Sequence, residues 1–315
     1  MTKIRVCFMG TPQFAVTCLQ SLLDGTEFEV VGVVTQPDRP AGRKLQLTPS
    51  AVKLLAMEKK LPIVTPDSLK TESEHWQVIR SWNADVAVVV AFGQILTENF
   101  MSIFPHGCVN VHASLLPKWR GAAPIQRSIE AGDQVTGVAL QKMVKKLDAG
   151  DVIGVRQCEI GKNQNALELH DVLAKLGAET LTTDLITYVR GQAKLTVQDE
   201  TQVTYAKKIE NSEALIDWNL SAKLIHQKVR AFVLGPGTYT LLQQKKIKIH
   251  RCEVVDQKTN HRPGVIEQMN PDSLDIACGE QVLRIFELQP ESRQRMFVAD
   301  FLKGHQLKKG DSFGE

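Results

Sequence analysis

Short apolar runs alternate with longer segments of helical spacing along the N-terminal part of the chain, and this alternation constrains the fold more than any other feature. The run at residues 85–92 is apolar at nearly every position, which is typical of a strand buried on both faces. Strands that alternate with helices form βαβ units and a parallel sheet. We therefore predict a doubly wound, mostly parallel, Rossmann-like α/β domain, with strands at 3–9, 28–34, 61–65, 85–92 and 107–112 and helices at 12–23, 49–60, 71–82 and 166–190.

The pattern of apolar and polar residues changes after residue 190. A polar stretch without a sustained apolar period predicts a connection between domains. One helix follows at 219–233, and then come five short alternating runs separated by Gly, Pro and Asn, which predict a small antiparallel β-barrel or sandwich. We expect an α/β domain at 1–190, a linker at 191–210 and a β domain at 211–315.

Composition excludes several classes of protein. Hydrophobic residues make up 43% of the 315, which is enough for two packed cores, and no apolar run approaches the roughly 20 residues of a membrane span. The first ten residues lead directly into a strand and lack the layout of a signal peptide. The six cysteines are far apart with no Cys-x-x-Cys pair, so we expect mostly buried, reduced thiols, no structural zinc and a cytoplasmic enzyme. The net charge of +3 permits an anionic partner without requiring one.

The strand that ends at His112 carries two polar residues on one face. Alternation places Asn110 and His112 on the same side of the sheet, and ligands of open parallel sheets bind beyond the carboxyl ends of strands. An amide can donate to a developing oxyanion, and an imidazole can donate or accept a proton. The alternative is that Asn110 closes the strand and His112 is a satisfied, partly buried side chain. The cations that follow, Lys118 and Arg120, fit either contact with an anionic partner or a solvated surface.

A tight connection, LDAGD at 147–151, lies between two further predicted strands at 135–143 and 152–160. Asp148 and Asp151 are typical turn residues there. A carboxylate in this turn could also orient a histidine from a neighbouring strand end. Spacing alone does not bring the two together.

Two other segments carry positive charge. The connection at 35–50 is long for a βα loop and contains three prolines and the cations Arg39, Arg43 and Lys44, so it suits an anionic partner or a solvated surface. In KKIKIHR, alternation places Lys246 and Lys248 opposite two isoleucines, as on a barrel strand that follows a phosphate backbone or on an ordinary solvated face. The MGTPQF turn lacks the glycines of a dinucleotide-binding loop.

Six motifs together resemble one family, the formyltransferases that use 10-formyltetrahydrofolate. They are MGTPQFA (9–15), TQPDRPAGR (35–43), NVHASLLPKWRGAAPIQ (110–126), LDAGD (147–151), YAKKI (205–209) and IDW (216–218), in the family's order and over nearly the whole chain. The SLLP-x-x-x-G segment after Asn-x-His is highly specific for the formyl-folate group. The PDRPAGR loop and the C-terminal β domain are similar to the branch of the family that acts on transfer RNA.

The resemblance implies a reaction and its residues. A formyl group would pass from 10-formyltetrahydrofolate, as cosubstrate, to the α-amine of initiator methionyl-tRNA, without a metal. Asn110 and His112 would stabilise the oxyanion, and Asp148 would support His112 and proton transfer. The folate would contact Ser114, Leu115, Leu116 and Pro117 and the segment of Phe92, Gly93, Gln94, Ile95 and Leu96.

The resemblance also implies an RNA-binding surface. The C-terminal domain would have an OB-like barrel fold and touch the tRNA. A lysine that the family commonly has is here Asn211, which leaves two neighbouring lysines of the linker as candidates. The implied contacts are Arg39, Arg43, Lys44, Lys207, Lys208, Lys246 and Lys248. We expect a monomer.

Three alternatives stay open at this point. A formyltransferase acting on a sugar-nucleotide amine and a domain that hydrolyses formyl-folate share the Asn-x-His and SLLP features. The PDRPAGR loop argues against both. A nucleic-acid-binding module on an inactive scaffold would require the combination of Asn110, His112 and Asp148 to be a coincidence.

Overall fold

The computed structural model describes residues 2–41 and 46–314, and the chain divides into two compact units. The first unit comprises residues 1–124, 135–159 and 170–206, and the second comprises 125–134, 160–169 and 207–315. The functional boundaries expected at residues 190 and 210 stay a prediction. Within the described part of the chain, no helix combines the length and apolar character that crossing a bilayer requires.

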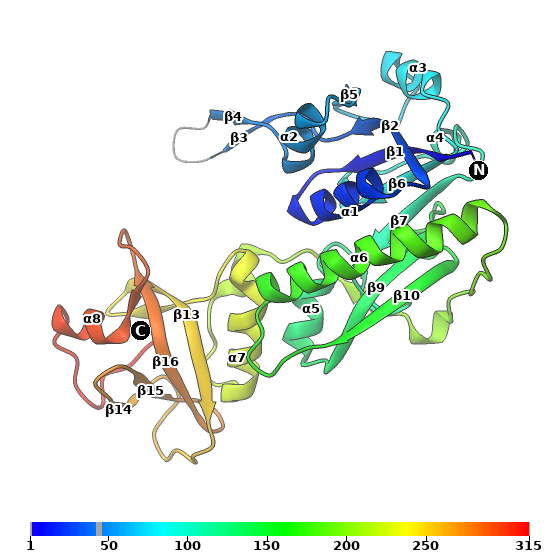
Figure 1. Ribbon diagram of the computed structural model, residues 1–315. Coiled ribbons are helices and arrows are strands. Elements are labelled where there is room, and N and C mark those ends of the chain that lie inside the picture. The colour runs from blue at the N-terminus through cyan, green and yellow to red at the C-terminus, as the bar shows by residue number, and fades with distance from the viewer. Residues whose placement is uncertain (1, 42–45, 315) are drawn as a thin grey trace. The chain divides into compact units, whose positions relative to one another are not determined.

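A seven-stranded sheet forms the centre of the first unit, in the order β10-β9-β7-β6-β1-β2-β5 (Figure 1). The strands from β7 to β5 are parallel to their neighbours, and β9 and β10 extend the sheet in antiparallel fashion. The chain order reverses between β1 and β6, where a doubly wound sheet places its ligand site. The strands are β1 Ile4–Gly10, β2 Phe28–Val34, β5 Ile63–Val64, β6 Val86–Val90, β7 Cys108–His112, β9 Val135–Lys142 and β10 Val152–Glu159.

Helices cover both faces of this sheet. On one face, Gly177 of α6 packs against Val111 of β7. On the other, Trp76 of α3 and Phe100 of α4 meet edge to face, with ring centroids 5.1 Å apart, in a buried cluster that includes Cys108 of β7. These contacts confirm the predicted doubly wound α/β fold. The helices of the first unit are α1 Gln13–Asp24, α2 Ala51–Glu58, α3 Glu74–Ser81, α4 Glu98–Met101 and most of α6 Ala166–Val189, whereas α5 Pro124–Ala131 falls in the second unit apart from its first residue.

The structure adds elements that periodicity did not predict. The connection at 35–50 contains a short hairpin, β3 Arg39–Ala41 paired with β4 Gln46–Thr48. A second pair, β8 Arg120–Gly121 and β11 Tyr205–Ala206, is parallel and joins segments far apart in the chain. Strands this short have too few residues to show a period of two. Helices α4 and α5 were missed as well.

The second unit is an antiparallel sheet in the order β12-β13-β16-β15-β14, with β17 paired to β16, and it curls into a half-barrel. This confirms the predicted small antiparallel β domain. Its core includes Ile247 and Ile249 of β13, and the indole of Trp218 donates to the Thr240 hydroxyl at 2.9 Å. The elements are α7 Ala222–Ala231, β12 Tyr239–Leu242, β13 Lys245–Val255, β14 Ile266–Met269, β15 Leu274–Ala277, β16 Val282–Pro290, β17 Met296–Phe297 and α8 Val298–Lys303.

The cysteines are mostly buried, as the sequence predicted. All six are free thiols, and five of them are buried. Burial raises the pKa of Cys18 and of Cys278 to about 12, so these thiols are protonated at neutral pH. Among the described residues, no group of three or more His, Cys, Asp or Glu side chains is placed to hold a metal ion.

Candidate active site

Asn110 and His112 lie at the carboxyl end of β7, on the face that alternation predicts. Strand β9 pairs with β7 so that Asn110 lies opposite Gln141 and His112 opposite Ala139. His112 is buried, with 5% of its surface exposed, whereas Asn110 is partly exposed. The imidazole is therefore enclosed by protein, and the amide lies at the border between protein and solvent.

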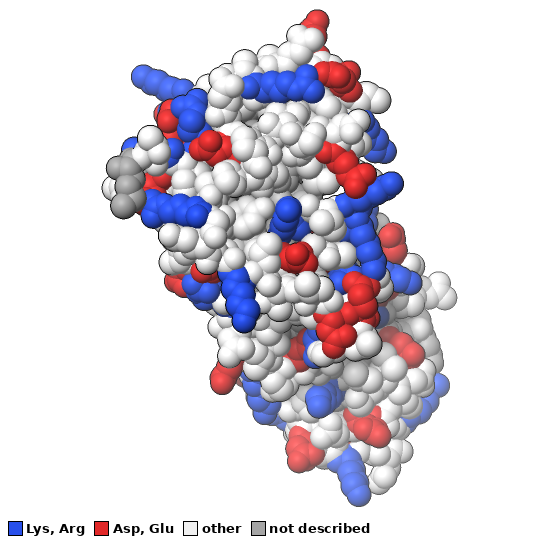
Figure 2. All heavy atoms as spheres, turned by 90° about the vertical axis from the view of Figure 1, so that its right-hand side faces the viewer, with Lys and Arg blue, Asp and Glu red and all other residues white. Residues whose placement is uncertain are grey.

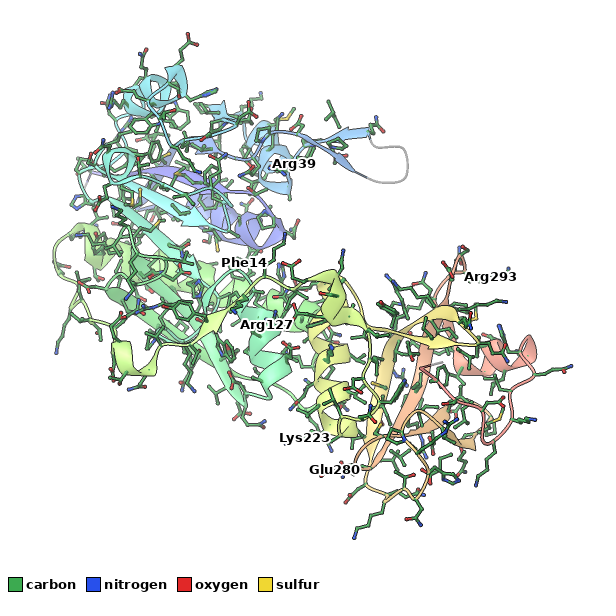
Figure 3. The ribbon with its side chains drawn as sticks, turned by 180° about the vertical axis from the view of Figure 1, so that it is seen from behind. Phe14, Arg39, Arg127, Lys223, Glu280 and Arg293 are labelled. Atoms are coloured by element: carbon green, nitrogen blue, oxygen red, sulfur yellow. The ribbon has the colours of Figure 1, made fainter. Side chains whose placement is uncertain are left out.

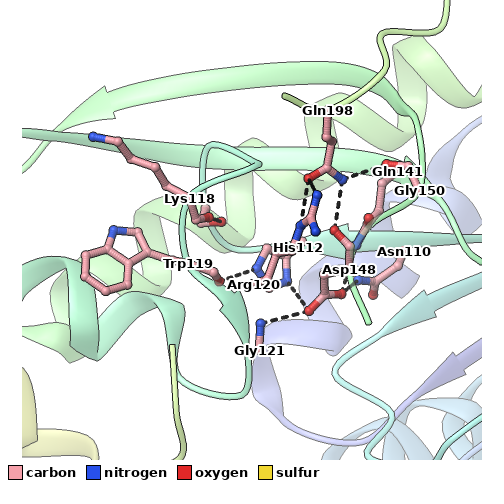
Figure 4. Close-up of polar contacts among 11 residues, drawn as sticks. Asn110, His112, Lys118, Trp119, Arg120, Gly121, Gln141, Asp148, Gly150 and Gln198 are labelled. Atoms are coloured by element: carbon pink, nitrogen blue, oxygen red, sulfur yellow. Dashed lines mark hydrogen bonds and ion pairs between the residues drawn. The ribbon is translucent and has the colours of Figure 1, made fainter. Parts of the chain in front are cut away.

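The turn at 147–151 brings Asp148 to these two residues (Figure 4). Its Oδ1 accepts from the side-chain amides of Gln141 at 2.9 Å and of Asn110 at 3.4 Å. Its Oδ2 accepts from the backbone N–H of Gly121 at 2.9 Å and lies 3.8 Å from His112 Nδ1. The structure thus assembles an amide, an imidazole and a carboxylate that sequence spacing alone could not place together.

The backbone of Trp119 fixes the histidine ring. His112 Nε2 lies 2.8 Å from the Trp119 carbonyl oxygen. A carbonyl oxygen only accepts, so Nε2 carries a hydrogen and Nδ1 is the nitrogen left to face Asp148. Any proton exchange by this imidazole with a ligand must therefore use Nδ1.

The SLLP segment, expected at a folate pocket, follows directly. Ser114 is fully buried, and its hydroxyl donates to the Lys118 carbonyl at 2.6 Å, so this side chain closes the turn. Leu115, Leu116 and Pro117 are partly exposed and leave an apolar surface beside the end of β7. Apolar groups beside a few polar ones are typical of the lining of a small-molecule site.

The segment Phe92–Leu96 follows the carboxyl end of β6, next to β7 in the sheet. The Phe92 carbonyl accepts from Thr11 at 3.0 Å and from Gln36 at 3.1 Å, and the phenyl ring is buried. The Gln94 amide bonds to the backbone of Pro66 and Leu69. Ile95 is 70% exposed, and Leu96 is buried below it. Of this segment, Ile95 therefore offers the largest free apolar surface.

The predicted RNA contacts are exposed or partly exposed where they are described. Arg39, on the β3–β4 hairpin (Figure 3), donates to Gln36 Oε1 at 2.9 Å. Arg43 and Lys44 lie outside the described residues. Lys207 and Lys208 are exposed. In β13, Lys246 and Lys248 are partly exposed, opposite the two buried isoleucines, and Lys246 Nζ lies 3.8 Å from the centroid of the Tyr239 ring.

Charge is distributed without a dominant basic patch on the face drawn in Figure 2, where basic and acidic side chains are intermixed. One cation expected at the surface is in fact internal. Arg120 is fully buried, so the hypothesis that it contacts an anionic partner or solvent is wrong. Lys118 is exposed.

Sequence reasoning missed three groups that touch the cluster. Gln141 had a signal, because it is a polar residue inside a buried strand. The Trp119 carbonyl had none, because a backbone carbonyl leaves no trace in residue type, whereas Gly121 is the glycine of the SLLP-x-x-x-G motif. Gly121 adopts a φ of +124° and an added Cβ would lie 2.7 Å from the Ala206 carbonyl oxygen, so this position requires glycine.

Family models match both parts of the chain. The model described as formyl transferase covers residues 2–185, and the model of the formyl transferase C-terminal domain covers residues 208–306. The methionyl-tRNA formyltransferase of Bdellovibrio bacteriovorus is 61% identical over 317 residues, covering 100% of each chain. The enzyme of the same name from Coxiella burnetii is 44% identical over 303 residues, covering 96% of each.

Solved structures share the fold at low identity. A sugar 3N-formyl transferase, described in the presence of dTDP and 5-N-formyl-tetrahydrofolate, aligns with a TM-score of 0.66 at 19% identity and covers 93% of this chain and 100% of its own. The phosphoribosylglycinamide formyltransferase of Anaplasma phagocytophilum aligns with a TM-score of 0.53 at 20% identity, over 66% of this chain and 100% of its own.

Proposed function

The chain belongs to the methionyl-tRNA formyltransferase family of formyl-transferring enzymes, and we propose that it transfers the formyl group of 10-formyltetrahydrofolate to the α-amine of initiator methionyl-tRNA. One observation supports the assignment of this reaction to particular residues. The Asp148 carboxylate lies between the Asn110 amide and the His112 imidazole at the carboxyl end of β7. A cytoplasmic location and a monomeric state stay predictions.

The oxygen of the formyl group gains negative charge as the neutral amine attacks the formyl carbon. We assign two donors to this oxygen. The Asn110 amide has a second hydrogen besides the one directed at Asp148, and a protonated His112 can donate from Nδ1, because Nε2 is held by Trp119. Removing one donor to such an oxyanion commonly costs about 10²–10³ in rate.

Asp148 serves proton movement in this proposal. The amine must lose a proton, and the folate nitrogen must gain one as the bond to the formyl carbon breaks. A protonated His112 can give its Nδ1 proton to the folate nitrogen and take the amine proton in its place, and Asp148 Oδ2, 3.8 Å from Nδ1, places beside the ring a negative charge that stabilises its charged form. Neither a covalent enzyme intermediate nor a metal has a role in this scheme.

The folate cosubstrate fits the apolar groups beside the cluster. Leu115, Leu116 and Pro117 are partly exposed next to β7, and Ile95 is 70% exposed next to β6. We assign these groups to the flat rings of the folate, since aromatic ligands bind apolar surfaces with a few polar groups at one end. We assign the exposed cations Arg39, Lys207 and Lys208 and the partly exposed Lys246 and Lys248 to tRNA phosphates.

The purified protein is incubated with 10-formyltetrahydrofolate that carries a label in its formyl group. Methionyl-tRNA, a sugar-nucleotide amine or buffer alone is then added in three separate reactions. We expect label on methionyl-tRNA. Label on the sugar amine only, or release of formate only, would overturn the proposal.

A histidine variant tests the site in the same assay. His112→Ala should lower formyl transfer by at least about 10²-fold while the protein remains folded, because the variant loses a donor to the oxyanion. His75→Ala, at an exposed position of α3, is the matched control and should be as active as the parent. Near-normal turnover of His112→Ala would remove His112 from the mechanism.

A further inference from the structure

The side chain of Gln198 bonds to the backbone of the turn that carries Asp148. Gln198 lies after α6, next to the short helix Glu200–Gln202, and is 7% exposed. Its Nε2 lies 2.8 Å from the Asp148 carbonyl oxygen and 2.7 Å from the Gly150 carbonyl oxygen. One amide group thus uses both of its hydrogens to hold two carbonyls of a single turn (Figure 4).

This turn needs an external support. Asp148 has a φ of +48°, in the left-handed region that residues with a side chain disfavour, aspartate less than most. Gly150 is packed so tightly that an added Cβ would lie 1.6 Å from the Lys142 carbonyl oxygen. The two bonds from Gln198 therefore stabilise the turn conformation that directs the Asp148 carboxylate at His112.

Arg120 determines which way the Gln198 amide faces. Arg120 Nε and Nη2 donate to Gln198 Oε1 at 3.0 and 2.8 Å, and Nη2 also donates to Glu200 Oε1 at 2.8 Å. A guanidinium has no acceptor, so the amide oxygen must face Arg120 and the amide nitrogen must face the turn. The buried cation therefore orients the amide.

The same short segment also touches the site directly. The residue before Arg120 offers the carbonyl that holds His112, and the residue after it offers the N–H that binds Asp148. Arg120 is thus flanked by the two backbone groups that fix the imidazole and the carboxylate. A shift of Arg120 would move both.

We propose that Gln198, oriented by Arg120, is a positioning residue that sets the place of the Asp148 carboxylate beside His112. The inference rests on the proposed role of Asp148 in formyl transfer. Gln198 acts through the backbone of the turn and touches neither substrate. Its loss should therefore lower the rate of the chemical step and leave substrate binding unchanged.

Two variants test this role. Gln198→Glu keeps the bonds from Arg120 and replaces the two donations by repulsion between oxygens, and Gln198→Met removes the donors at similar volume without adding a charge. We expect each to lower kcat about 10–100-fold, since a misplacement of about 1 Å can cost 10²-fold, with KM for both substrates within about twofold. Gln227→Glu, the same change at a glutamine of α7 that is 6% exposed, is the matched control and should retain full turnover.

A double-mutant cycle separates positioning from a loss of structure. If Gln198 acts through Asp148, then Gln198→Glu should cost less than about threefold in an Asp148→Asn background. An equal loss in both backgrounds, or near-normal kcat in both Gln198 variants, would overturn the inference and leave the proposed function standing. Near-normal turnover of Asp148→Asn alone would instead refute the proposed role of Asp148, a result that does not depend on Gln198.

Discussion

Replacing Asp148 by asparagine keeps the shape of the side chain and removes its charge, so it isolates what the carboxylate does. Every group directed at this side chain is a donor or the histidine ring. Oδ1 accepts from Gln141 and Asn110, and Oδ2 accepts from Gly121 and faces His112. An asparagine must place its NH₂ at one of these two positions. Either orientation sets a donor against at least one other donor.

The size of the effect follows from these contacts. A hydrogen bond to a charged acceptor contributes about 1.5–3 kcal/mol, and the variant loses at least one of them together with the charge beside His112. We expect the barrier to formyl transfer to rise by about 3–4 kcal/mol, which corresponds to a loss in rate of about 10²–10³. Asp148→Ala should be no more than a few times worse, because it loses the same charge.

Single-turnover transfer of labelled formyl to methionyl-tRNA measures this rate, and folate binding is titrated separately. Asp151→Asn is the matched control, since Asp151 lies in the same turn and undergoes the same chemical change. A rate for Asp148→Asn within about tenfold of the parent, with folate binding intact, would refute a role for this charge in the reaction.

Two further predictions concern the second unit. Burial, and then the charges of Arg230 and Lys162, lowers the pKa of His226 from 6.5 to about 4, so the unfolded chain binds this proton first as the pH falls. Because of His226, the free energy of unfolding should fall by up to about 3 kcal/mol as the pH is lowered from about 6.5 to about 4. His226→Gln should remove this part of the pH dependence of the free energy measured by urea unfolding. An unchanged pH dependence in the variant would refute the prediction. Changing Lys246 and Lys248 to Gln should weaken tRNA binding, with folate affinity unchanged. The plot of log tRNA affinity against log salt concentration should become less steep by about one for each phosphate contact that is lost. An unchanged affinity and an unchanged salt dependence would show that this face is ordinary solvated surface.

The fold was predictable because its signal is local. The strand β6 is buried on both faces and is apolar throughout, and the helix α1 is buried on one face and has Phe14, Cys18 and Leu22 at four-residue spacing. Burial therefore leaves a pattern in the sequence. The same reasoning placed Asn110 and His112 on one face of β7. It failed at the β8–β11 pair, because each of these two-residue strands forms only by pairing with the other, which is far away in the sequence.

The candidate site was predictable only in part. Asp148 was recognised through a motif, and its distance to His112 depends on how the turn folds back over the sheet, which no spacing gives. Arg120 was predicted at the surface because arginine is usually exposed. Its burial depends on an acceptor at Gln198, 78 residues away in the chain.

The groups that sequence reasoning missed divide into two kinds with different consequences for substitution. Trp119 and Gly121 contact the site through the backbone, so the residue type at these positions does not directly supply the contact. Gln198 acts through its side chain, and its geometry requires one acceptor for Arg120 and two donors for the carbonyls of the turn. Lysine and arginine cannot accept from Arg120, and glutamate cannot donate to the carbonyls. A buried arginine therefore constrains the residue type at a distant position, and that position in turn controls the geometry of the candidate site.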